Sequence, residues 1–345
     1  MAVRWGRWLR WIFLIAMLSG VAVIATLHHD ELRQAGHLMA RASPWYMLAA
    51  VGSIVGVYFN RGSAYRVALT IMGYSLDRWF LSRTALVATS IHQLIPTGGA
   101  SGYAFLTYAF NQRGISAGQA SIVALVDTVT YAAALASLVI VALIHLVTGG
   151  SITGASLTLG LIPGLLLLAA ACGLYYLQRD HDRLLRFAKR AKNGIARLLG
   201  REWADGPLER FIGEYYEGKR LVMRTPRRFF RMLAYQYGAV AFDCLTLYLM
   251  FVALGVLPNP WIVFVGFVVA MAGVSVVAVP AGGGSFEIVM SSFFATHGIK
   301  TADGLAAALL YRVAAFWLPV LWSIVILLRL RRRRRAVRRI ERPEP

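Results

Sequence analysis

Long apolar runs alternate along this chain with short segments rich in arginine and lysine. A membrane-spanning helix needs about 20 predominantly apolar residues, and several of the runs approach or exceed that length. The pattern therefore predicts an all-α polytopic membrane protein with about six full spans. The runs expected to cross are 11–27, 44–59, 116–147, 157–177, 229–254 and 305–328.

Two other apolar runs are interrupted by proline and glycine. Pro280 and the triplet 282–284 divide residues 261–279 from 285–296, and Pro96 with Gly98 and Gly99 divides 79–95 from 98–110. Proline and glycine disfavour a continuous helix, so each run is predicted to be two half-helices with a break. The arms are short for full crossings, which favours two re-entrant hairpins.

The two breaks are related by a constant offset of 184 residues, from Pro96 to Pro280. At this offset the glycines and serines of the breaks coincide, as do residues that follow them. Repeated broken helices are typical of secondary transporters with inverted-topology repeats. We expect the break residues to contribute to a substrate site, with Ser285 capping its half-helix. These residues are Gly98, Gly99, Ser101, Gly282, Gly283 and Ser285.

Composition excludes a soluble protein, because 58% of the residues are hydrophobic and the mean hydropathy is +0.60. The net charge of +20 could indicate a nucleic-acid partner. However, the basic residues occur in blocks between apolar runs, as the positive-inside rule describes. We therefore expect no nucleic acid, and the basic tail is expected to contact anionic lipid headgroups.

Charge also sets the expected orientation, with both termini on the cytoplasmic side of a bacterial inner membrane. The chain is expected to form a single transmembrane domain over residues 1–345. The sequence leaves open whether this domain forms a homo-oligomer. Its predicted parts are an extra first helix (1–28), repeat one (44–147), a linking span (157–178), a cytoplasmic segment (179–228), repeat two (229–329) and a basic tail (330–345). The cytoplasmic segment reads either as an amphipathic helix on the membrane surface or as a packing helix of a small cap.

Ionisable residues inside apolar runs are costly, so each is a functional candidate. Glu287 follows the second break and Arg312 lies in the last span, and we expect the two to pair. The pair could be a structural lock. Alternatively, Arg312 could hold an anionic headgroup while Glu287 serves as counter-charge or proton carrier, which is the reading we favour.

Other polar residues in the spans are weaker candidates. Asp127 and Asp243 are expected to form hydrogen bonds between helices rather than to act in transport. His92 is expected to be a packing residue. Arg61 and Arg66 are expected to mark the membrane interface, although they could meet lipid phosphate.

The sequence contains no phosphate-binding loop of nucleotide hydrolases, no metal-ligand cluster and no nucleophile elbow. We therefore expect no cofactor, no metal and no catalytic residue. An integral-membrane lipid-modifying enzyme, or an accessory subunit of one, is the alternative to a transporter.

The segments PAGGGSFE and AALLYRVAAFWLP resemble the membrane domain of the lysylphosphatidylglycerol synthetase/flippase family. The resemblance covers most of the chain, and implies a stand-alone lipid-translocating domain without the soluble synthetase. The family's proline-glycine-glutamate motif falls on Pro280, Gly282, Gly283 and Glu287, and its Tyr-Arg pair falls on Tyr311 and Arg312. Many family members carry an acidic residue and an arginine near the first glycine break. The first repeat departs from this pattern, because residues 98–103 contain neither.

These observations together predict a lipid flippase. We expect it to move an amphiphile with an anionic headgroup, a phospholipid or polyprenyl phosphate, between the leaflets of the membrane. Two inverted halves would rock about the site to give alternating access.

Overall fold

The computed structural model describes residues 29–95, 100–148, 224–276 and 284–340, and scattered positions between 180 and 220. Every regular element in these residues is helical, so the protein is an all-α membrane protein. Three described helical stretches are long and apolar enough to cross a membrane, or four if a bent pair counts as one span. The bent pair consists of 33–40 and 44–71, at 95° to each other. The predicted spans 11–27 and 157–177 lie outside the described residues.

The described helices fall into two series of the same order. The first series contains α3 (Pro44–Ile71), α4 (Arg78–Leu94), α5 (Ala100–Asn111) and α6 (Ala117–Thr148). The second contains α10 (Pro226–Ala253), α11 (Pro260–Val276), α12 (Ser285–Thr296) and α13 (Thr301–Arg312), which continues through η2 (Val313–Trp317) into α14 (Leu318–Ile340). A short helix, α2 (His29–Ala40), precedes the first series and packs on α13.

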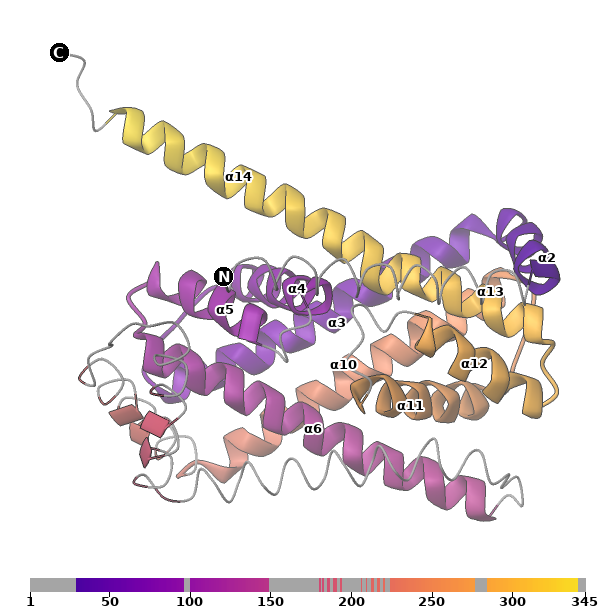
Figure 1. Ribbon diagram of the computed structural model, residues 1–345, viewed down its shortest axis with the longest axis horizontal. Coiled ribbons are helices and arrows are strands. Elements are labelled where there is room, and N and C mark those ends of the chain that lie inside the picture. The colour runs from indigo at the N-terminus through magenta and orange to yellow at the C-terminus, as the bar shows by residue number, and fades with distance from the viewer. Residues whose placement is uncertain are drawn as a thin grey trace.

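Helices α3 and α10 hold equivalent places in the two series and run antiparallel through the middle of the molecule (Figure 1). The backbone N–H of Ser43, just before α3, donates to the carbonyl of Ala253 at the end of α10, at 2.8 Å. Further along, the Ser53 hydroxyl donates to the Phe242 carbonyl at 2.8 Å. Because equivalent helices point in opposite directions, the two series have the inverted relation expected of the repeats.

Two further contacts follow the same symmetry. Helix α14 packs against α4, and its counterpart α6 packs against α11. One hydrophobic core lies mainly among α4, α5, α6 and the second half of α3, and the other among α11, α12, α13 and the second half of α10. Figure 1 shows α4 and α5 at one end of the molecule, and α2, α11 and α12 at the opposite end.

Each broken run forms two packed arms, α4 with α5 and α11 with α12. The arms have 17 and 12 residues in both series, which at 1.5 Å per residue is about 26 and 18 Å. Neither arm alone covers a hydrocarbon core of about 30 Å, which favours hairpins over full crossings.

The short arms α5 and α12 end in the same way. Gly114 and Gly298 follow them with φ of 77° and 79°, in the left-handed region that glycine adopts without strain. The N–H of Ile115 bonds to the Phe110 carbonyl, and that of Ile299 to the Phe294 carbonyl, as in a glycine-terminated helix end. The offset of 184 residues thus corresponds to a repeated backbone structure.

Two details differ from the sequence-based expectation. Helix α3 continues to Ile71, twelve residues beyond the predicted end of its span at Phe59, and ends just before Gly73, whose φ is 86°. Helix α12 begins at Ser285 itself, and its N-cap is Gly284 with φ of 83° and no side-chain hydrogen bond. Ser285 is therefore not the capping residue.

The scattered positions between 180 and 220 include an ion pair in which Lys189 Nζ lies 2.7 Å from Glu209 Oε1. Ile212 is buried, and Tyr216 packs against the core of the first series. Through Tyr216, the segment between residues 179 and 228 packs against the helical domain.

Candidate functional site

Glu287 and Arg312 form the ion pair that the sequence predicts. Arg312 Nε lies 2.9 Å from Glu287 Oε1, and the side chains are only 16% and 15% exposed. Glu287 sits in the first turn of α12, where the helix dipole favours a negative charge. The Arg312 guanidinium carbon also lies 5.0 Å from the ring centroid of Phe286. The pair thus joins the second hairpin to the last span.

Tyr311, beside Arg312, connects a third helix to this pair. Its hydroxyl donates to Asp243 Oδ1 on α10 at 3.2 Å. Its ring stacks on Phe286 with centroids 5.3 Å apart, and meets Phe267 edge-on at 5.7 Å. Because the ring is held on two sides, the hydroxyl is fixed in its direction toward the carboxylate.

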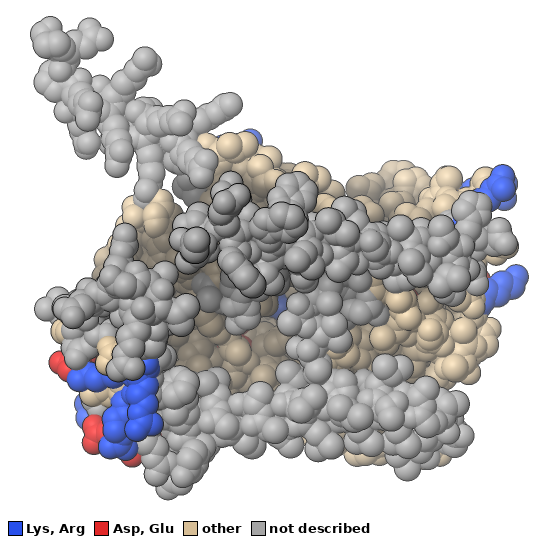
Figure 2. Space-filling model, in the orientation of Figure 1, with Lys and Arg blue, Asp and Glu red and all other residues tan. Residues whose placement is uncertain are grey.

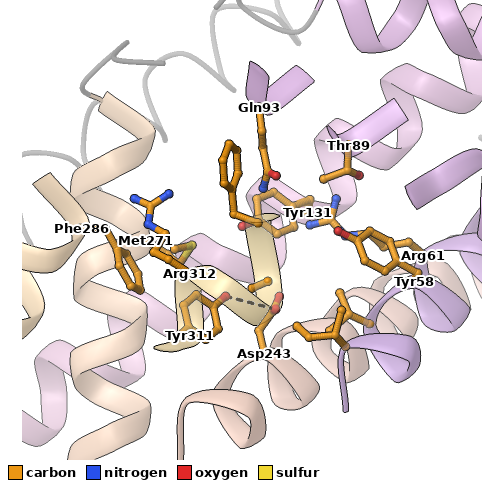
Figure 3. Close-up of a pocket in the computed structure, with 14 residues that line it drawn as sticks. Tyr58, Arg61, Thr89, Gln93, Tyr131, Asp243, Met271, Phe286, Tyr311 and Arg312 are labelled. Atoms are coloured by element: carbon orange, nitrogen blue, oxygen red, sulfur yellow. Dashed lines mark hydrogen bonds between the residues drawn. The ribbon is translucent and has the colours of Figure 1, made fainter. Parts of the chain in front are cut away.

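Asp243, Phe286, Tyr311 and Arg312 border a pocket of about 110 Å³ between the two series of helices (Figure 3). The volume is below the roughly 300–1,000 Å³ of pockets that bury drug-sized ligands, so it suits a small polar group. Figure 2 shows a hollow near the middle of this face, with blue of a basic side chain inside it. The lining residues are Ile54, Val57, Tyr58, Arg61, Thr89, Gln93, Tyr131, Asp243, Met271, Phe286, Tyr311, Arg312, Ala315 and Phe316.

Arg61, which the sequence analysis assigns to the membrane interface or to a lipid phosphate, lines this pocket. Helix α3 extends past residue 61, which places the side chain between the two series instead of at a helix end. Its guanidinium carbon lies 5.1 Å from the ring centroid of Tyr131, a cation–π distance. Figure 3 shows Arg61 and Arg312 at opposite sides of the pocket.

Asp127 lies outside the pocket lining and connects three helices, as the sequence predicts. Its Oδ1 accepts a hydrogen bond of 2.7 Å from Gln236 on α10, and its Oδ2 accepts one of 3.4 Å from Tyr65 on α3. Asp243 also accepts a hydrogen bond between helices, from Tyr311, but it lines the pocket as well.

The remaining candidates lie elsewhere. His92 is exposed and does not line the pocket, and its Cβ atom lies close to Gly102 of α5. The Ser101 hydroxyl donates to the Ile95 carbonyl at 3.3 Å, across the first break. Gly98, Gly99, Gly282 and Gly283 lie outside the described residues, as does the side chain of Ser285.

The pocket brings together residues that hold equivalent places in the two series. Helices α3 and α10 begin 182 residues apart, at Pro44 and Pro226, and this offset relates Arg61 to Asp243. It also relates Thr89 to Met271, and all four residues line the pocket. The pocket therefore lies where the symmetry axis of the two series is expected. Comparing the segments before the breaks at an offset of 182 residues, instead of 184, would have related Arg61 to Asp243 from the sequence alone.

The residues that the structure describes contain no group of three or more His, Cys, Asp or Glu that could hold a metal ion. The pocket lining offers arginine, carboxylate, amide and tyrosine groups for recognition of a ligand. Two arginines on opposite walls are suited to binding phosphate oxygens.

Comparison with known proteins agrees with this architecture. A UPF0104 membrane protein of Pyrococcus horikoshii is 27% identical over 127 residues, which cover 36% of this chain and 38% of that relative. The chain thus matches well under half of the relative's length. A family described as the lysylphosphatidylglycerol synthase TM region matches residues 11–323, nearly the whole chain. The protein therefore belongs to the lysylphosphatidylglycerol synthase transmembrane-region family.

Proposed function

We propose that this protein is a lipid translocase, which moves an amphiphile with an anionic phosphate in its headgroup between the leaflets of a bacterial inner membrane. The observation that carries the proposal is the small polar pocket between two inverted series of helices, lined by Arg61 from one and Arg312 from the other. The family's membrane-lipid context supports the substrate class.

The pocket suits a headgroup and not a whole lipid, because its volume is about 110 Å³. In this proposal the phosphate binds between the arginines, while the acyl chains stay in the hydrocarbon region. The two series rock about the pocket and open it to each side in turn, as in other inverted-repeat transporters. The protein thereby acts as a transporter and does not change the lipid chemically.

The test is translocation of acyl-labelled phospholipid in liposomes that contain the purified protein, with the lipid mass measured afterwards. The proposal expects movement faster than in protein-free vesicles, without a change of mass. A change of mass would instead establish a lipid-modifying enzyme. Absence of movement for every phospholipid and for polyprenyl phosphate would overturn the proposed function.

The Glu287–Arg312 pair gives a sharper test, since it separates a structural lock from a binding site. Glu287→Gln combined with Arg312→Met removes both charges, so no buried charge stays unpaired. The double variant should melt like the wild type but lose translocation, because the cationic wall is missing. A stable and fully active double variant would contradict binding by Arg312.

We also propose that both termini are cytoplasmic and that the basic tail binds anionic lipid, as the distribution of basic residues suggests. Single cysteines in a cysteine-free background test the orientation. A cysteine between 148 and 156 should react with an impermeant reagent from outside, and one after Arg329 should not. External labelling of the tail would reject this orientation.

A further inference from the structure

Arg61 is a buried cation near the carboxylates of Asp127 and Asp243, but within the described residues it forms an ion pair with neither. Its Nε atom is buried and has no hydrogen-bond partner, and none of the ion pairs found there includes it. Its guanidinium carbon faces the Tyr131 ring at 5.1 Å. Arg312, on the opposite wall, is already paired with Glu287 at 2.9 Å. Arg61 therefore brings to the pocket a positive charge that the carboxylates of Asp127 and Asp243 stabilise without direct contact.

Asp243 provides a negative charge at the equivalent position of the second series. It occupies the place in α10 that Arg61 occupies in α3, and it lines the same pocket. One oxygen accepts the hydrogen bond from the Tyr311 hydroxyl at 3.2 Å, and no ion pair within the described residues includes the carboxylate. The pocket thus contains a positive and a negative group that attract each other without forming a direct ion pair.

A charge taken out of water is costly unless an opposite charge and hydrogen bonds compensate it. A ligand with only a phosphate would bind Arg61 but bring a second negative charge close to Asp243. A ligand with a phosphate and an ammonium group would compensate both. An ammonium group has three donors, which a carboxylate oxygen can accept.

We propose that the pocket selects a zwitterionic aminophospholipid headgroup, with its phosphate at Arg61 and its primary ammonium at Asp243. This inference rests on the proposed function and names the substrate class. It assigns headgroup specificity to Asp243, which the sequence analysis expects only to form a hydrogen bond between helices. Arg61 then binds a group that all phospholipids share, whereas Asp243 distinguishes among headgroups.

The experiment compares two acyl-labelled lipids in liposomes, phosphatidylethanolamine and its N-acetylated derivative. The two have the same phosphate and similar size, but acetylation removes the positive charge of the amine. The wild type should move phosphatidylethanolamine roughly tenfold faster or more, as expected for a hydrogen bond to a charged group. Asp243→Asn should abolish this preference, and Arg61→Gln should slow both lipids.

Asp127→Asn is the matched control, because Asp127 is also an aspartate between helices but does not line the pocket. It should leave the ratio of the two rates unchanged, whatever its effect on stability. Equal wild-type rates for the two lipids would overturn the inference while leaving translocation itself established, and so would an unchanged preference in a folded Asp243→Asn variant. If neither lipid nor any other phospholipid moves, the proposed function fails and this inference with it.

Discussion

The two series of helices place a different pair of side chains at the same position. In the second series Glu287 of α12 forms an ion pair with Arg312 of α13. The residues 184 positions earlier are Tyr103 of α5 and Thr128 of α6, and their hydroxyl groups form a hydrogen bond with each other. A contact between the short arm and the following span thus occurs in both halves, charged in one and neutral in the other.

This comparison shows which features the fold requires and which it does not. Both halves keep the glycines that end their short arms, Gly114 and Gly298. The short arm and the span have a polar contact in both halves, and in the first half the neutral Tyr103–Thr128 pair provides it. The charges of Glu287 and Arg312 therefore exceed what the fold demands, which supports a functional role.

The span after the ion pair differs as well. Helix α6 is uninterrupted over 32 residues, whereas its counterpart contains the π-helical segment Val313–Trp317 directly after Arg312. Pro319 provides a reason, because it has no N–H to donate to the Ala315 carbonyl of a regular α-helix. π-Helical segments are frequent at functional sites, and Ala315 and Phe316 line the pocket.

The largest effect is expected when only one charge of the ion pair is removed. Arg312→Met leaves the Glu287 carboxylate, 15% exposed, without its cation, and should lower the free energy of unfolding by about 3–5 kcal/mol. Thermal melting in detergent measures this loss. Glu287→Tyr combined with Arg312→Thr copies the first series and should recover most of it. A single variant as stable as the wild type would show that the charges are too well hydrated for the comparison to hold.

A smaller loss is expected at Gly62, where α3 approaches α4. A Cβ atom there would lie 2.6 Å from the Ser82 backbone nitrogen, so the helices would have to separate. Overpacking of this kind costs about 1–3 kcal/mol, which denaturant titration of Gly62→Ala can measure. The equivalent position in α10 is Cys244, so alanine there should be tolerated better. Equal losses at the two positions would remove this difference between the halves.

Gly114→Ala and Gly298→Ala should each cost about 1–2 kcal/mol, since a Cβ atom meets nothing within 4 Å and only the left-handed backbone is strained. The melting temperatures of the two variants should fall by similar amounts. A clear inequality would mean that the two arms are not equivalent in stability.

The smallest effect is expected for Tyr103→Phe, which removes the hydrogen bond to Thr128 in the first half. Hydrogen bonds between membrane helices contribute about 0.6 kcal/mol on average, and Tyr103 is 36% exposed. The change in melting temperature should be far smaller than that of Arg312→Met. A loss as large as that of Arg312→Met would show that the neutral pair is as important to the fold as the charged one.

The sequence predicts most features that depend on local chemistry. The glycine breaks, the ends of the short arms and the Glu287–Arg312 pair follow from residue types and from one offset. Arg61 was missed for a physical reason, because an arginine near the end of an apolar run looks like an interface residue when the helix is thought to end at Phe59. Its relation to Asp243 was hidden because helices before the breaks are 182 residues apart, whereas the breaks are 184 apart.

Ser285 shows a second limit of sequence reasoning. Serine is a favoured N-cap, so the sequence suggests that it begins the half-helix. Gly284 takes that place with positive φ, which serine would adopt only with strain, and the helix starts one residue later. Neighbouring residues that both suit a helix start are distinguished by backbone geometry, which local propensity does not specify.

The antiparallel contact between α3 and α10 also has a consequence for biosynthesis. The backbone bond from Ser43 to Ala253 joins residues more than two hundred positions apart, and one face of α3 is covered only when α10 has arrived. At about 5–20 residues per second, the ribosome needs roughly 10–40 s to make the intervening chain. During that interval the face of α3 that α10 later covers is exposed in the membrane. Lipid, or helper proteins that recognise unassembled spans, can contact it.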